Sequence, residues 1–208
     1  MLRIFGRLSS LNTQKVMFCV YELGLEHELV AAGREFGVVD TPDYRALNPN
    51  GLVPTLVEDG FALWESNAII RYLCAQHSRG DLWPEDARER ALADSWMDWQ
   101  QTQLQRALHP ELHSLSSDPG RFTPERIEAA RMRCETLMDM LDSRLGQVPF
   151  VSGARFGMAD CAMAPPVHRW MNLAVERGTY RAVEDWFGRV SQRPAARKTL
   201  PAGARHGS

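Results

Sequence analysis

The sequence predicts an α+β protein in two parts, a mixed strand-and-helix domain over residues 1–79 and an all-helical domain over residues 87–200. Three observations support this fold class. The first part alternates strand and helix patterns in the order βαβαββα. A break that contains Gly80 and Pro84 follows, and every apolar pattern after the break has helical spacing. Such a change of element type along a chain favours an α+β fold with two domains.

The mixed domain begins with two strands around a helix. Residues 2–5 are a short apolar run, typical of a buried strand. Apolar residues at helical spacing predict a helix from about Thr13 that ends at Gly24. The segment His27–Ala31 has the pattern of a second strand. Residues 33–50 are polar and predict a loop with a short irregular helix.

A hairpin and a third helix complete this domain. Residues 55–57 and 62–64 are short strands on either side of Asp59-Gly60, a dipeptide typical of two-residue hairpin turns. Residues 66–76 then place their apolar side chains along one helical stripe.

The second domain contains only helical patterns. Residues 88–113 predict one long amphipathic helix. Thr123 as N-cap and Pro124 at the first helical position predict the next helix, which continues to Gly146. Two further helices are expected over 158–177 and 180–192.

The composition excludes several classes of protein. A formal net charge of −2 leaves no basic face of the kind that binds nucleic acid. No apolar run approaches the roughly 18 residues of a membrane span, and the first residues lack a signal-peptide pattern. The four cysteines are far apart in sequence with no CxxC pair, which argues against a disulfide framework or a thiolate zinc site. We therefore expect a cytoplasmic protein that binds neither nucleic acid nor membrane.

Two dipeptides carry most of the functional information. Val53-Pro54 stands at the start of a strand, although proline has no N–H to donate to the hydrogen bonds of a sheet. A cis peptide bond at Pro54 would leave the Val53 backbone free to bond an extended peptide. Glu65-Ser66 stands where a strand passes into a helix, whose N–H groups and dipole favour an anion. Ser66 adds a hydroxyl donor and Glu65 can accept an ammonium. Together they suit the α-amino-acid end of a ligand.

This pair of dipeptides, at this spacing and ahead of an all-helical half, resembles the glutathione site of the glutathione S-transferase family. The resemblance covers about residues 1–195 and implies a thioredoxin-like N-terminal domain. It also implies that Val53-Pro54 grips the cysteinyl backbone of glutathione and that Glu65-Ser66 holds its γ-glutamyl end. The alternative is a structural proline turn followed by an ordinary helix cap.

The second domain supports the same resemblance. Residues 150–160 are similar to the family's G-x-x-[ST]-x-A-D helix start, in which Asp160 would close a capping box. Here Gly157 stands at the N-cap in place of Ser or Thr. Glycine caps nearly as well, so the motif is weakened but not broken.

The resemblance implies that a side chain activates the glutathione thiol. A free thiol has a pKa of about 8.5, so a donor at a helix N-terminus must stabilise the thiolate. The turn before the first helix offers Ser10, which we favour, then Asn12 and Ser9. Each of the three has the alternative role of capping the helix.

The chain departs from the family pattern before Val53. Family members often have Lys or Gln there, in contact with the glycine end of glutathione, whereas this chain has Leu52. Arg34, Gln14 or a residue of a partner subunit are the candidates to replace that contact.

The acceptor-substrate pocket is expected between the loop after the first strand and the long helix of the second domain, although aromatic residues on that helix are more often core. Its candidate residues are Trp96, Trp99, Gln100, Gln103 and Arg106. His109 and His113 lie four apart, a spacing that can bind a metal, but no third ligand is evident, so we expect no metal.

The resemblance implies a homodimeric detoxification enzyme whose glutathione thiolate attacks small hydrophobic electrophiles. Two alternatives remain open at this stage. One is a glutathione-dependent peroxidase or disulfide reductase. The other is a non-catalytic interaction protein that keeps the fold.

Overall fold

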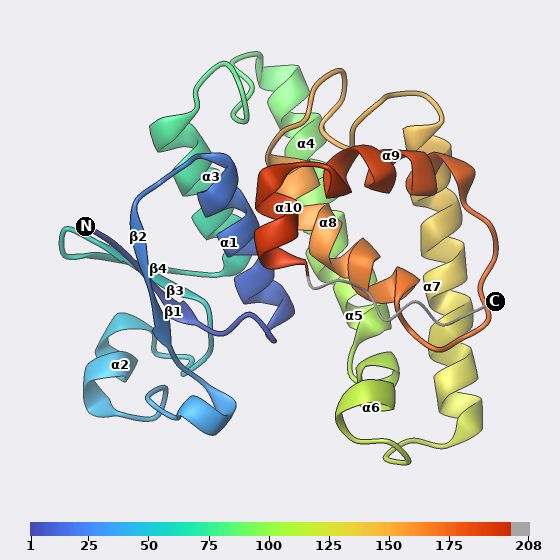
Figure 1. Cartoon of the computed structure of the whole chain (residues 1–208), viewed down its shortest axis with the longest axis horizontal. Coiled ribbons are helices and arrows are strands. Elements are labelled where there is room, and N and C mark those ends of the chain that lie inside the picture. The colour runs from blue at the N-terminus through green and yellow to red at the C-terminus, as the bar shows by residue number, and fades with distance from the viewer. Residues whose placement is uncertain (201–208) are drawn as a thin grey trace.

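The computed structural model of the chain describes residues 1–200. The N-terminal domain is built on a four-stranded sheet of order β2-β1-β3-β4 (Figure 1). β1 and β2 are parallel, and the other two pairs are antiparallel. The strands are β1 (Leu2–Gly6), β2 (His27–Ala31), β3 (Thr55–Glu58) and β4 (Phe61–Trp64).

Helices cover both faces of this sheet, as the thioredoxin-like prediction requires. α1 (Leu11–Glu22) and α3 (Ser66–His77) pack on the face that carries Ile4 and Leu56. α2 (Pro42–Leu47) follows a short 3-10 turn and covers the opposite face. The hairpin forms as predicted, with Asp59 and Gly60 both at positive φ (48° and 86°).

The C-terminal domain is entirely helical over its described residues, and α8 lies at its centre against α1 and α4 (Figure 1). Nearly all of α8 is buried, and Trp170 and Trp186 are among the largest enclosed side chains. The helices are α4 (Ala87–Trp99), α5 (Gln105–Leu108), α6 (Glu111–Ser117), α7 (Pro124–Leu145), α8 (Met158–Met171), α9 (Arg181–Ser191) and α10 (Pro194–Thr199).

The prediction of one helix over residues 88–113 is wrong. α4 passes into a π-helical turn over Gln100–Leu104, and the helix ends at Leu108. His109 is extended (φ −137°, ψ 138°) because the following Pro110 excludes the helical region for it. α8 is also shorter than predicted, since it ends at Met171.

The capping box at the start of α8 forms in a modified way. The Asp160 carboxylate accepts hydrogen bonds from the Gly157 N–H (3.0 Å), the Val151 N–H (2.8 Å) and the Trp186 indole (2.7 Å). The Ser152 hydroxyl accepts from the Ala159 N–H at 3.1 Å, which replaces the missing N-cap side chain. A Cβ at residue 157 would lie 2.8 Å from that hydroxyl, which explains the glycine.

The cysteines are free thiols, as expected, but they are not all isolated. Cys19 and Cys74 are buried between α1 and α3, with their sulfur atoms 3.6 Å apart. Burial raises the pKa of Cys134 and of Cys161. Over residues 1–200, no helix is both long and apolar enough to span a membrane.

Candidate functional site

Two hollows flank the turn that leads into α1. The first, which we call the cradle, is a pocket of about 130 Å³ between that turn, the segment before β3 and the start of α3. It brings together both predicted dipeptides and one of the three predicted thiolate donors. The cradle is lined by Asn12, Asn48, Asn50, Leu52, Val53, Pro54, Trp64, Glu65, Ser66 and Gln101.

The Val53-Pro54 wall of the cradle is fixed by hydrogen bonds to the preceding residue. The peptide bond is cis, as the sequence predicts. The Leu52 carbonyl accepts hydrogen bonds from the Tyr44 hydroxyl (2.6 Å) and the Asn48 amide (2.9 Å). Tyr44 is buried on the sheet, so this wall is tied to the core while the Leu52 side chain stays 65% exposed.

The opposite wall is the start of α3, where the backbone is unusual. Glu65 has φ 70° and ψ 112°, a region that favours glycine. A residue held there costs on the order of 1–3 kcal/mol and persists only where the surroundings enforce it, commonly at ligand sites. Ser66 follows as the first residue of the helix, so its N–H group and hydroxyl lie at the positive end of the α3 dipole.

Asn12 is fixed in one orientation by two donors. Its Oδ1 atom accepts from the Ser66 hydroxyl (3.3 Å) and from the Lys15 ammonium (3.4 Å). The carboxamide oxygen therefore points into the protein, and the Nδ2 group is the side that remains to donate. Lys15 also donates to Gln101 Oε1 at 3.0 Å, which links α1 to the π turn of the other domain.

Lys15 is a buried residue beside the cradle that the sequence prediction did not include among the site residues. Its side chain is fully buried, and this burial, opposed by Glu65 and assisted by Arg71, lowers its pKa to about 7. Lys15 lies one turn from both Leu11 and Cys19, on the buried face of α1. A charged residue on the apolar face of a helix is the signal by which it could have been found.

Replacing Lys15 by methionine should flatten the pH dependence of stability. The pKa of Lys15 is lower in the folded state than in the unfolded one. The unfolded chain therefore binds more protons between pH ~7 and pH ~10.5, and stability rises with pH across that window. Calorimetric unfolding of wild type between about pH 7 and pH 9 should show this rise and Lys15→Met should lack it.

The other lysine of the chain provides a matched control. Lys198 is exposed on α10, so Lys198→Met should retain the wild-type slope. An unchanged slope in Lys15→Met would mean that Lys15 is solvated in the folded protein.

The other two predicted donors occupy different places on the same turn. Ser10 is the N-cap of α1, and its hydroxyl accepts from the Thr13 N–H at 3.5 Å. Ser9 is exposed, and its carbonyl accepts from Arg169 at 3.4 Å. Of the three candidates, Asn12 lines the cradle and Ser9 lines the second hollow.

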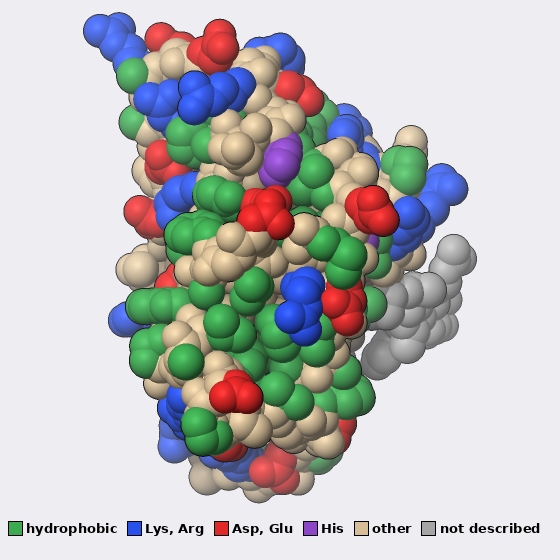
Figure 2. All heavy atoms as spheres, turned by 90° about the vertical axis from the view of Figure 1, so that its left-hand side faces the viewer, with side chains coloured by type: hydrophobic (Ala, Val, Ile, Leu, Met, Phe, Trp, Pro, Cys, Tyr) green, Lys and Arg blue, Asp and Glu red, His purple; other side chains and the backbone are tan. Residues whose placement is uncertain are grey.

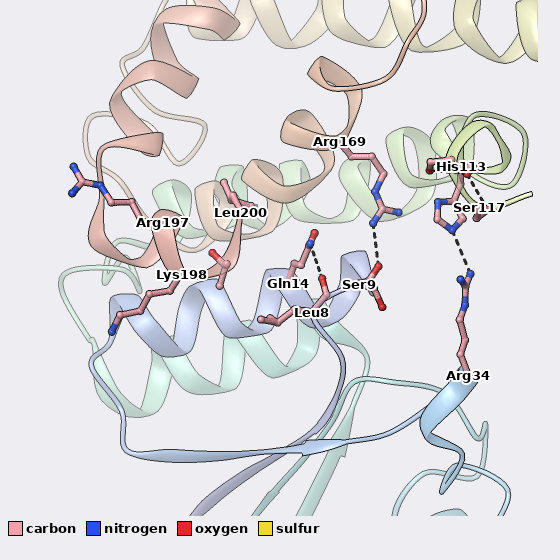
Figure 3. Close-up of a pocket in the computed structure, with 12 residues that line it drawn as sticks. Leu8, Ser9, Gln14, Arg34, His113, Ser117, Arg169, Arg197, Lys198 and Leu200 are labelled. Atoms are coloured by element: carbon pink, nitrogen blue, oxygen red, sulfur yellow. Dashed lines mark hydrogen bonds between the residues drawn. The ribbon is translucent and has the colours of Figure 1, made fainter. Parts of the chain in front are cut away.

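The second hollow, the interdomain cleft, has a volume of about 690 Å³ (Figure 3). It lies between the turn before α1, the Arg34 turn, and helices α6, α8 and α10. Arg34 therefore lines this cleft and not the cradle, and it donates to His113 Nε2 at 3.3 Å. The cleft is lined by Leu8, Ser9, Gln14, Arg34, His113, Ser116, Ser117, Arg169, Arg197, Lys198, Thr199 and Leu200.

The residues expected on the helical side of the acceptor pocket, which lie on α4, the π turn and α5, do not line the cleft. Trp96 and Trp99 stack edge to face at 5.1 Å and pack against the core, and Gln100 is fully buried. The spacing of apolar residues over 88–113 shows which side chains share one face of a helix, but it does not show which part of the protein that face contacts. The cleft wall of the helical domain comes instead from α6, α8 and α10.

His109 and His113 stack with their ring centres 5.3 Å apart. Burial and the nearby Arg169 lower the pKa of both, that of His113 to about 4, so both rings are neutral near pH 7. Within the described part of the chain, no group of three His, Cys, Asp or Glu side chains is arranged to hold a metal ion.

Comparison with known proteins matches both halves of the chain. The model for the glutathione S-transferase N-terminal domain matches residues 9–76, and that for the C-terminal domain matches residues 124–195. Glutathione S-transferase GstB of Escherichia coli (strain K12) is 38% identical over 203 residues, 96% of this chain and 98% of that protein. The disulfide-bond oxidoreductase YfcG of the same strain is 29% identical, over 91% of this chain and 90% of its own length.

A solved structure is similar over nearly the same extent. The theta class glutathione S-transferase of Xanthomonas axonopodis pv. citri, crystallised with glutathione bound, is 37% identical. It superposes with a TM-score of 0.92 over 97% of each chain. With both domains and the dipeptides of the cradle in place, this chain belongs to the glutathione S-transferase family.

Proposed function

We propose that the protein binds glutathione in the cradle and joins it, through its sulfur, to small hydrophobic electrophiles. The observation that carries the proposal is the convergence of Asn12, Val53 and Glu65-Ser66 on one pocket. Val53 presents backbone to the cysteinyl residue, and the start of α3 presents N–H groups and a carboxylate to the γ-glutamyl end. In this pose the sulfur lies at the turn before α1, beside Asn12.

Activation of the thiol follows from that placement. Asn12 Nδ2 donates to the sulfur, and the positive end of the α1 dipole favours the thiolate. The sulfur then forms a bond to the electrophilic carbon, the leaving group departs with the electrons of the broken bond, and the thiol proton passes to solvent. Ser10, which we favoured from the sequence, and Ser9 are the other candidate donors on this turn.

Two measurements test the proposal together. Calorimetric titration should show glutathione binding, and an aryl chloride mixed with glutathione should release chloride and a thioether. A protein that binds no glutathione would overturn the proposal. Binding without turnover of any electrophile would favour the non-catalytic interaction protein.

The γ-glutamyl assignment predicts the effect of Glu65→Gln. This substitution removes the charge that faces the glutathione ammonium, so the Kd for glutathione should rise by about tenfold or more, as expected for a charge-assisted hydrogen bond. The exposed Glu85 serves as the matched control, and Glu85→Gln should leave the Kd unchanged.

A ligand lacking the ammonium sharpens this test. Glutaryl-cysteinylglycine is glutathione with hydrogen in place of the γ-glutamyl amino group. Wild type and Glu65→Gln should bind it equally well. If Glu65→Gln weakens both ligands by the same factor, Glu65 does not bind the ammonium.

Reduction of disulfides or peroxides is the second candidate, favoured by the similarity to YfcG. In that reaction a first glutathione thiolate attacks the disulfide and a second resolves the mixed disulfide, which yields oxidised glutathione and two thiols. This function would be selected if the protein oxidises glutathione when hydroxyethyl disulfide is supplied and forms no thioether from aryl chlorides.

We also propose a cytoplasmic homodimer that removes electrophiles. The face of the N-terminal domain in Figure 2 carries many hydrophobic side chains separated by single charges. Exposed apolar residues of that domain include Leu52, Phe61 and Trp64. An exposed face rich in apolar side chains suits contact with a second copy. Light scattering that gives the monomer mass at micromolar concentration would exclude the dimer.

A further inference from the structure

The interdomain cleft is strongly cationic for a pocket expected to take hydrophobic compounds. Four of its lining residues are basic, and none of its described lining residues is acidic. Arg169 and Arg34 approach the Ser9 turn from opposite domains, whereas Arg197 and Lys198 lie toward the other end of the pocket (Figure 3). Arg34 and Arg169 are therefore the basic residues nearest the turn before α1.

Neither of these arginines is paired with a carboxylate in the part of the chain that the structure describes. Within residues 1–200, no ion pair is formed by Arg169 or by Arg34. Arg169 is half-buried on α8, and its guanidinium donates to the Ser9 carbonyl at 3.4 Å. Burial, and then the charge of Arg34, lowers the pKa of Arg169. A desolvated cation without a carboxylate partner is costly, and a bound anion would relieve that cost.

His113 leaves this positive charge uncompensated. It accepts from Arg34 at Nε2, a bond that only the ring with an unprotonated Nε2 can make. The hydrogen bond holds the Arg34 side chain against His113, on the same side of the cleft as Arg169 (Figure 3). Two guanidinium groups thus face one space from two domains, and Leu8 adds apolar surface to the lining of the same cleft.

We propose that this end of the cleft binds a carboxylate on the acceptor substrate, with Arg169 as the principal ligand and Arg34 as the second. The inference rests on the proposed transferase function and narrows its substrate class to electrophiles that combine an apolar body with an anionic group. Guanidinium forks bind carboxylates in bidentate geometry, which also fixes orientation. The electrophilic carbon then faces the turn that holds the glutathione sulfur.

A matched pair of aryl chlorides tests this substrate class. 4-Chloro-3-nitrobenzoate and 4-chloro-3-nitrobenzamide differ in charge at one position, far from the carbon that reacts. In both, the sulfur bonds to the ring carbon, chloride leaves with the electron pair, and the thiol proton goes to solvent. Arg169→Met should lower kcat/KM for the benzoate by about tenfold or more and that for the benzamide by less than about twofold.

Arg181 at the start of α9 provides the control. It is exposed and lies outside the cleft lining, so Arg181→Met should leave kcat/KM unchanged for both compounds. An equal fall of both values in Arg169→Met would overturn the inference, because the arginine would then act on the sulfur or on the fold. No change for either compound would overturn it as well.

The glycine carboxylate of glutathione is the other source of the same anion. Titration of Arg169→Met with glutathione and with its glycyl ethyl ester separates the two. An unchanged Kd for both ligands supports the acceptor site. If Arg169→Met loses affinity for glutathione but not for the ester, the arginine binds the glycine carboxylate. That result overturns the inference and leaves the transferase function standing. Wild type that conjugates neither aryl chloride overturns both.

Discussion

Asn12→Ala is expected to raise the pKa of the bound glutathione thiol and to lower kcat/KM near neutral pH by about tenfold to hundredfold. A donor to a charged acceptor contributes about 1.5–3 kcal/mol, and each unit of pKa corresponds to about 1.4 kcal/mol. The effect should be large because Ser66 and Lys15 hold the Asn12 carbonyl, so that its amide group faces the cradle. Ultraviolet absorbance of the bound thiolate against pH measures the shift directly.

Alanine substitutions at the neighbouring serines identify the donor. Ser10→Ala should cost stability through the lost N-cap of α1, about 1 kcal/mol, and change the thiol pKa less than Asn12→Ala does. Ser9→Ala should change it least, since Ser9 faces the cleft. A larger pKa rise in Ser10→Ala than in Asn12→Ala would transfer the role to Ser10.

Asp160→Ala is expected to have the largest effect on stability, a loss of about 3–5 kcal/mol. The buried carboxylate accepts from the Trp186 indole and from the backbone N–H groups of Val151, Ser152 and Gly157, and all four donors would lose their partner. For a chain of this size the melting temperature should fall by about 10 °C. Differential scanning calorimetry measures both quantities.

The exposed Asp185 on α9 is the control for this substitution. Asp185→Ala should change the free energy of unfolding by less than about 0.5 kcal/mol. Asp160→Asn keeps the shape and one acceptor oxygen, so it should fall between wild type and Asp160→Ala. If Asp160→Ala unfolds like wild type, the carboxylate network does not anchor α8.

Local signals in the sequence were enough for most of the fold and for the cradle. Asp59-Gly60 specifies a hairpin through its own backbone preferences, and Val53-Pro54 lies close in sequence to Glu65-Ser66. These elements depend on neighbours within a few residues. They could therefore be predicted from the local sequence, and the structure confirms the hairpin and the cis bond.

The rest of the site depends on contacts that no local pattern encodes. The interdomain cleft is formed by segments as distant in sequence as Ser9 and Arg169, so its charge could not be read from any one helix. The π turn at Gln100–Leu104 places Gln101 beside Lys15 by shifting the helical phase, which a regular period misses. Arg34 was one of three candidates for the glycine end of glutathione; the structure places it in the lining of the cleft, and what it binds there is a prediction.

At residue 65 the backbone conformation that would favour stability and the side chain proposed for function call for different amino acids. Its φ of 70° is one that glycine adopts freely, so a search for a more stable protein would favour Glu65→Gly. That substitution would relax the start of α3 and at the same time delete the carboxylate that we propose as the partner of the γ-glutamyl ammonium. Stability engineering by backbone preference alone would thus select against ligand recognition, and thermostabilised variants of this enzyme are best designed with residue 65 held fixed.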